Sequence, residues 1–288
     1  MNSKAAAIGI LCGIGLCHDP ARAEDAPESA GYLRDRGPGV ATSIAGIYLD
    51  QGEWLGAASY QHLENRGFQY SPEEFGFVDA NDYLGKYESS GGIFFVGYGV
   101  SDSIALGLKV TGGSIKLTKA SDDLSAMPVE MKESGICNIA PELTWRFMSE
   151  TAHRPELYTF VTVEIPQNRD KNLIGTHDWV VLPGIGLNRG FSWATLSARM
   201  NYEYDAASAS TIDFGKWSID GQRRFSDAWW VSTGLEGQVG GANNFDEAWQ
   251  ITTVMWSASP HVAVRFDSRI GLTQQTKGWT GELGVVIR

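Results

Sequence analysis

Beyond its first 23 residues, the sequence lacks any apolar run long enough for a transmembrane helix, which needs about 20 consecutive apolar residues. The first 23 residues resemble a secretory signal peptide instead. Lys4 precedes a short apolar run from Ala5 to Leu16, and Ala21-Arg22-Ala23 supplies the small residues of a cleavage site. We therefore expect residues 1–23 to be removed and the chain to be exported from Glu24 onward.

Cysteine and positive charge are both scarce. Of three cysteines, Cys12 and Cys17 lie in the expected signal peptide, each after a leucine where a lipoprotein signal needs a small residue. The exported chain keeps only Cys137, so it has no internal disulfide. The whole chain has a net charge of −11, and removing the signal peptide's net +1 leaves −12. This acidic balance argues against nucleic acid as a partner.

Motifs for catalysis or cofactor binding are also missing. There is no Walker loop, dinucleotide fingerprint, HExxH or CxxC. A Ser–His enzyme would need a serine beside a histidine, and His177, near the start of a strand, has none at clear in-strand spacing. The paired acids Asp122-Asp123, like Asp79 and Asp82, are expected to be solvated in loops. We expect no catalytic residue, no cofactor and no metal, so the protein is not expected to be an enzyme.

The sequence is rich in alternation of apolar and polar residues, most clearly from His261 to Thr273. Val262, Val264, Phe266, Ile270 and Leu272 fall on one face of an extended strand, and His261, Arg265, Asp267 and Arg269 fall on the other. A soluble sandwich packs such an apolar face inward, whereas a membrane barrel turns it toward lipid. The strand by itself is compatible with both.

About twelve segments share this alternation, and most are about as long as the 9–11 residues that a tilted spanning strand needs. Strands in soluble proteins are usually about five or six residues long. The segments cover residues 53–63, 92–100, 104–112, 135–147, 155–165, 176–188, 193–204, 211–224, 228–239, 247–257, 262–272 and 278–288.

The connections between these segments also alternate in length. Mostly short turns lie at 101–103, 149–153, 189–192, 225–227 and 259–260, and mostly longer polar connections at 65–90, 114–134, 167–172, 206–210 and 240–246. Outer-membrane barrels have short periplasmic turns and longer outer loops. The sequence therefore predicts an all-β fold: a closed antiparallel transmembrane β-barrel of about 12 strands over residues 53–288. Residues 24–52 read as an irregular segment, which either lies in the periplasm or folds into the barrel mouth.

Charged residues on the polar strand faces would line the lumen of such a barrel. Neighbouring strands carry both signs, so these charges could pair, and twelve strands enclose a lumen between a filled interior and an open channel. We expect a small or partly occluded pore. The lining candidates are Lys109, Glu142, Arg146, Arg199, Glu203, Lys216, Asp220, Arg224, Glu236, Arg265, Asp267 and Arg269.

Aromatic residues often fall near the strand ends, in phase with the apolar face. Trp and Tyr prefer the boundary between water and lipid, so these side chains are expected to form girdles around the barrel. Good strand propensity alone would also explain some of them. They are Trp54, Tyr60, Tyr98, Trp145, Phe147, Tyr202, Tyr204, Trp229 and Trp279.

Three stretches resemble the outer-membrane MetA-pathway-of-phenol-degradation family, whose members are often described simply as transporters. They are the strand–turn–strand from Gly97 to Gly107, the stretch from Pro155 to Gly186, and that from Phe191 to Tyr204. The resemblance implies an outer-membrane barrel that acts as a channel for small aromatic or hydrophobic compounds, and it gives no catalytic residues. One departure is the last residue, Arg288, where outer-membrane strands commonly end in an aromatic side chain.

Together these patterns predict a passive channel or transporter for small solutes in the outer membrane of a Gram-negative bacterium. Its expected partners are outer-membrane lipid, a small-molecule permeant and the barrel assembly machinery. Two alternatives are an outer-membrane lipid-modifying enzyme and a secreted soluble β-sandwich binding module.

Overall fold

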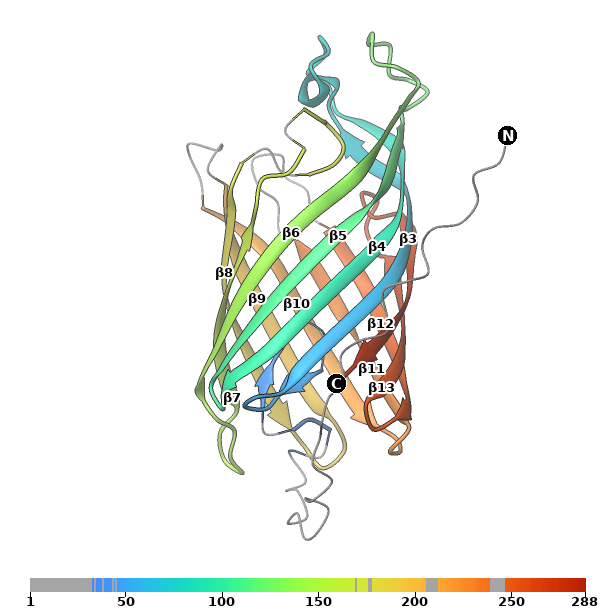
Figure 1. The fold of residues 1–288 in the computed structure, drawn as a ribbon. Coiled ribbons are helices and arrows are strands. Elements are labelled where there is room, and N and C mark those ends of the chain that lie inside the picture. Colours follow the sequence, from blue (N-terminus) through green and yellow to red (C-terminus); the bar gives the residue numbers. More distant parts are fainter. Residues whose placement is uncertain are drawn as a thin grey trace, which may run out of the picture.

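The protein is a closed antiparallel barrel of twelve strands in the computed structural model, which confirms the predicted fold class (Figure 1). The structure describes residues 33, 35–37, 39–42, 44, 46–168, 170–175, 178–205, 212–238 and 247–288. The expected signal peptide, His177, and the connections at 206–211 and 239–246 lie outside the described residues. Among the residues that are described, no helix is long and apolar enough to cross a membrane.

Each barrel strand pairs with its neighbours in sequence, and the first strand pairs with the last to close the ring. The strands are β3 (Trp54–Tyr70), β4 (Tyr83–Ser101), β5 (Ile104–Thr118), β6 (Glu130–Met148), β7 (Glu156–Glu164), β8 (Val180–Gly190), β9 (Thr195–Asp205), β10 (Ile212–Arg224), β11 (Trp229–Gln238), β12 (Glu247–Ser259), β13 (Val262–Gly271) and β14 (Gly278–Ile287).

The apolar face of the strands points outward. On β13, Phe266 is 49% exposed on the outer surface, whereas the next residue, Asp267, is 2% exposed and points inward. Phe266 pairs with Leu283 of β14, which pairs with Tyr60 of β3, and these side chains are also exposed. A contiguous apolar band therefore crosses neighbouring strands. A soluble protein rarely exposes such a surface, so the soluble sandwich is excluded.

Exposed aromatic pairs ring the barrel near its short turns, as a girdle requires. The rings of Trp54 and Tyr98 lie 4.4 Å apart, and those of Trp145 and Phe147 lie 5.9 Å apart. Phe191 with Trp193 and Trp229 with Trp256 form similar pairs further around the ring.

Strands β3 to β6 are longer than expected and rise beyond the rest of the barrel (Figure 1). They have 17, 19, 15 and 19 residues. The prediction of long loops at 65–90 and 114–134 is therefore wrong over much of both ranges, where paired strands continue. Within these two ranges, the connections are residues 71–82, which include the short helix η2 (Pro72–Phe75), and residues 119–129.

A small core holds the ends of these long hairpins together, and Tyr70 lies at its centre. Its hydroxyl accepts a hydrogen bond from the backbone N–H of Ala120 (2.8 Å) and donates one to Asp123 (2.7 Å). Burial and the bond to Asp123 raise the pKa of Tyr70 above its usual value. Leu117 and Met127 complete the cluster, so the hairpins form a packed outer structure rather than mobile loops.

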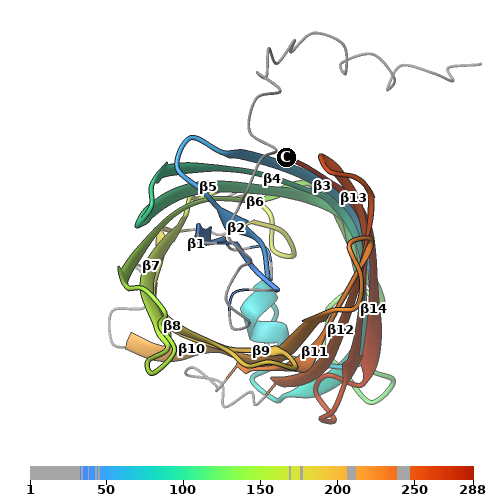
Figure 2. The ribbon, with the colours of Figure 1, turned by 90° about the horizontal axis from the view of Figure 1, so that it is seen from below.

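The segment before the barrel folds into its lumen at the end with the short turns (Figure 2). Two short strands, β1 (Val40–Ala41) and β2 (Tyr48–Leu49), pair antiparallel inside the ring. We call the described residues between 39 and 50 the plug. Of the two places that the sequence allows for this segment, the structure shows the barrel mouth.

The outward orientation of β13 generates the first prediction. Phe266→Arg should destabilise the barrel by about 2–4 kcal/mol, because it places a charge against hydrocarbon near the middle of a spanning strand. Urea unfolding of the protein in lipid vesicles measures this change. Val78→Arg is the matched control, since Val78 is also an exposed apolar residue but lies in the connection before β4. Equal stabilities of the two variants would contradict the membrane orientation.

Candidate functional site

The candidate site is the lumen, and its lower boundary is the plug. Inward-facing positions of β3, β4, β5 and β14 near the short turns are apolar, so they offer one side of the plug a hydrophobic surface. Val40, Ile47 and Leu49 of the plug are at most 2% exposed. They pack in one cluster with Ile44 and with the wall residues Leu55, Phe95, Ala105 and Val286.

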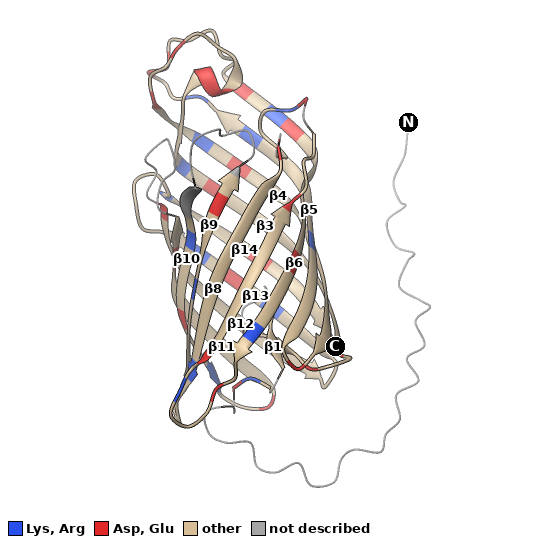
Figure 3. Cartoon of the chain, turned by 90° about the vertical axis from the view of Figure 1, so that its left-hand side faces the viewer, with Lys and Arg blue, Asp and Glu red and all other residues tan. Residues whose placement is uncertain are grey.

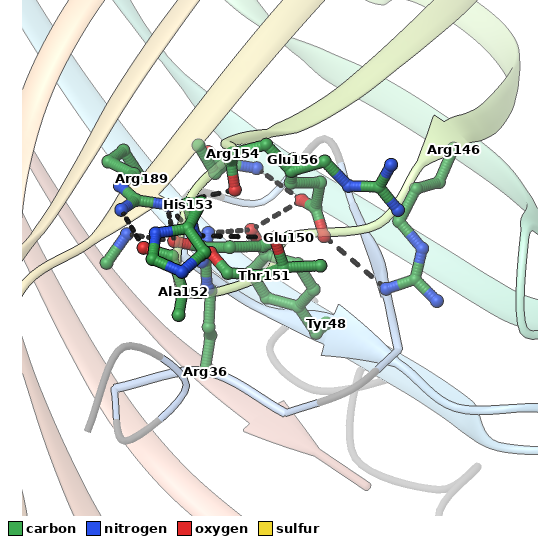
Figure 4. A network of polar contacts seen from close by, with 12 residues as sticks. Arg36, Tyr48, Arg146, Glu150, Thr151, Ala152, His153, Arg154, Glu156 and Arg189 are labelled. Carbon is green, nitrogen blue, oxygen red and sulfur yellow. Dashed lines mark hydrogen bonds and ion pairs between the residues drawn. The ribbon is translucent and has the colours of Figure 1, made fainter. Parts of the chain in front are cut away.

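A polar network ties the other side of the plug to β6, β7 and β8 (Figure 4). The Tyr48 hydroxyl donates to Glu156 (3.0 Å), and the Asn188 amide donates to the same carboxylate oxygen (2.6 Å). Arg146 lies 3.4 Å from the other carboxylate oxygen of Glu156 and also donates to the Gly39 carbonyl. Glu156 therefore has partners on the plug and on the wall, which offsets the cost of burying its charge.

A second ion pair anchors the residue that precedes the plug. Arg36 contacts Glu150, and both side chains are almost fully buried. Glu150 also accepts the backbone N–H of Gly190 (2.8 Å) and lies 3.5 Å from Arg189. Arg189 in turn donates to the carbonyls of Thr151, Ala152 and Arg154 in the turn between β6 and β7 (Figure 4). The plug is thus fastened to an ordered turn.

Two adjoining cavities lie inside the barrel. The larger is about 500 Å³, and the smaller is about 200 Å³ and lies directly against the plug residues Ala41, Thr42, Gly46 and Tyr48. Gly46 has a φ of +72°, and a Cβ there would collide with Gln222 and Trp230 of the wall. Only glycine therefore allows the plug backbone to lie this close to the wall.

Arg199, Ser218, Glu236 and Arg269 line both cavities and mark the passage between them. Arg199 of β9 pairs with Glu142 of β6 at 2.8 Å and lies over the Phe160 ring, 3.7 Å from its centre. On the other side, Arg269 of β13 pairs with Glu236 of β11 at 3.2 Å. Charges of both signs are interspersed along the strands (Figure 3), so a solute at this passage meets both.

The structure brings together most of the predicted lining residues. The cavities are lined by Lys109, Glu142, Arg199, Lys216, Asp220, Glu236, Arg265 and Arg269. Asp267 also points inward but is covered by Arg265, 2.7 Å away, and by Thr253.

Three predicted residues lie elsewhere. Arg146 contacts the plug rather than a cavity. Glu203 shares the inward face of β9 with Arg199 but lines neither cavity. Arg224 is exposed at the rim, where its guanidinium donates to the Asp227 carbonyl (3.4 Å). β10 ends at this residue, and Arg224 lines neither of the two cavities.

Sequence reasoning missed the apolar part of the lumen. Leu63, Phe68, Tyr87, Leu182 and Trp249 point into the larger cavity among the charged residues. It also missed Arg36, Tyr48 and Glu150, which hold the plug. One feature of the sequence does indicate an apolar part of the lumen. Tyr158 and Phe160 fall at inward positions of β7, where a water-filled lumen would favour polar side chains.

No protein-family model matches the sequence, and no curated protein matches it. Among solved structures, an outer membrane channel from Pseudomonas putida F1 has a TM-score of 0.64 and 16% identity, over 86% of this chain and 99% of that one. At this identity the match shows a shared fold. The KdgM porin is less similar, with a TM-score of 0.47 and 8% identity over 81% of this chain and 98% of that one. The Ralstonia pickettii toluene transporter TbuX has a TM-score of 0.40 and 10% identity, over 83% of this chain and 89% of that one. Neither similarity supports a conclusion about this chain.

The network around Glu156 generates the second prediction. Glu156→Gln should loosen the plug, because it removes the carboxylate charge that Arg146 and the Tyr48 hydroxyl contact, and such charged hydrogen bonds contribute about 1.5–3 kcal/mol. The plug should then open roughly tenfold to a hundredfold more often. The measurement is the rate at which a cysteine at Ala41, in a Cys137→Ser background, reacts with a water-soluble thiol reagent.

Glu164→Gln is the control for this experiment, since Glu164 lies on the same face of β7 but lines the larger cavity, away from the plug. It should leave the rate unchanged. If both variants react at the same rate, Glu156 does not hold the plug.

Proposed function

We propose that the protein is a passive channel for small solutes in the outer membrane of a Gram-negative bacterium. One observation carries this proposal: an apolar outer surface encloses two adjoining cavities lined by charged residues. A membrane protein that served only as an anchor would gain nothing from keeping ionised groups in an enclosed cavity, since buried charges are costly. The fold shared with the Pseudomonas putida F1 channel supports the same function.

Export by the signal peptide at 1–23, contact with outer-membrane lipid and folding by the barrel assembly machinery belong to this proposal. So does the division of the exported chain into an irregular N-terminal segment, 24–52, and a barrel, 53–288. The stretches that resemble the MetA-pathway-of-phenol-degradation family support membership in that family and small aromatic or hydrophobic permeants.

The alternative of a lipid-modifying enzyme would need an activated serine. Strand pairing places His62 opposite Ser90, and the His62 Nδ1 lies 2.7 Å from the Ser90 hydroxyl. Among the described residues, no carboxylate bonds to this imidazole, and its ring contact with Trp279, 5.4 Å away, cannot orient it as a carboxylate would. We therefore interpret the pair as a cross-strand hydrogen bond.

Planar-bilayer recording tests the channel and yields the third prediction. The mature protein should give a small conductance, because the plug fills the lumen at one end. Deletion of residues 24–50 should raise that conductance several-fold, since twelve strands enclose a wider space than side chains alone fill. A silent wild-type protein at all voltages would contradict the channel, and equal conductances would show that the plug does not limit the flow.

Ion selectivity yields the fourth prediction. Arg199→Gln should shift the reversal potential in a salt gradient toward cation preference, because it leaves Glu142 unneutralised at the passage between the cavities. Glu142→Gln should shift it toward anions. Arg224→Gln, which removes an exposed charge at the rim, should have little effect because water and salt screen it. Shifts of the same sign in the first two variants would refute the assigned passage.

A further inference from the structure

Two lysines reach into the larger cavity from opposite sides of the barrel. Lys109 lies on β5 and Lys216 on β10, which are far apart around the ring. Both side chains are exposed, yet they point into the lumen. The two side chains therefore face the interior of the same cavity.

Unlike the arginines of the lumen, these lysines have no carboxylate within ion-pairing distance in the described part of the chain. Arg199, Arg265 and Arg269 are each paired at 3.2 Å or less. Lys109 and Lys216 line the same cavity, as do Glu142 and Glu164, whose charges attract both lysines. Two like charges in a confined space repel, and an anion between them would relieve this cost.

The same cavity has an apolar wall. Trp249 is 8% exposed, and the rings of Phe68 and Tyr87 are stacked 4.7 Å apart. Leu63 and Leu182 add aliphatic surface. A volume of about 500 Å³ falls within the range of small-molecule sites, about 300–1,000 Å³. A bare inorganic anion would leave this wall in contact with water, whereas an organic anion would cover it.

We propose that the larger cavity binds small organic monoanions, with the carboxylate between Lys109 and Lys216 and the apolar body against the wall that includes Trp249. Glu164 and Glu247 line the cavity as well, so the lining favours a single carboxylate over a dianion. This inference rests on the proposed channel, because it names the class of solute that would pause in its lumen.

Isothermal titration calorimetry of the folded barrel in detergent tests the site without requiring conductance. The probes are benzoate, its neutral analogue benzamide, and acetate, which has the charge but no ring. Wild-type protein should bind benzoate at least tenfold more tightly than either analogue. The double variant Lys109→Gln, Lys216→Gln should weaken benzoate binding about tenfold or more and leave benzamide binding unchanged.

Lys86→Gln is the matched control, since it removes a lysine that pairs with Glu64 and Glu88 and lines neither cavity. Trp249→Leu should weaken benzoate but not acetate, which separates the apolar wall from the lysines. Equal binding of benzoate and benzamide, or wild-type benzoate affinity in the double variant, would overturn the site. Bilayer silence together with lysine-dependent benzoate binding would overturn the channel alone.

Discussion

Exposure of apolar side chains to hydrocarbon, with ionised groups enclosed by the ring, is the constraint on which the rest of the structure depends. A strand in lipid cannot leave backbone groups unpaired, so the sheet must close on itself. Because side chains alternate, closure fixes both faces at once: a one-residue slip would turn Asp267 to lipid and Phe266 into the lumen. The need to turn apolar side chains toward lipid is therefore enough to set the strand register from β3 to β14, whatever the lumen contains.

Closure also leaves empty space, because twelve strands enclose more volume than their own inward side chains fill. At the end with the short turns, the plug fills part of this volume. Apolar inward residues such as Leu55 and Phe95 pack against Val40 and Leu49 instead of facing water. The chain end takes part as well: the Arg288 guanidinium lies 3.4 Å from the Tyr48 carbonyl.

The barrel could be predicted from the sequence because each spanning strand carries its own signal. The alternation of apolar and polar residues in 262–272 can be recognised without knowing which strands pair with it. The alternation of short and long connections can also be recognised from the sequence alone. The contacts of the plug could not be predicted, because they join residues far apart in sequence, such as Tyr48 and Glu156. In addition, β1 and β2 each have two buried residues in a row, so they show no alternation of buried and exposed positions.

The long hairpins were missed because strands beyond the membrane need no apolar outer face. The sequence could predict which charged residues face the lumen. It could not predict that Arg199 pairs with Glu142, because β6 and β9 are not neighbouring strands.

The lumen charges divide into two groups with different physical settings. Those beside the plug, such as Glu156 and Arg146, are buried and have several partners, as a low-dielectric interior demands. Lys109 and Lys216 line the larger cavity and have no ion-pair partner among the described residues. A charge without an internal partner is the one that a passing solute can engage at the least cost, because no ion pair has to break first. The plug therefore does more than narrow the barrel, because it also supplies partners for the buried charges of Glu156 and Arg146 at its end of the lumen.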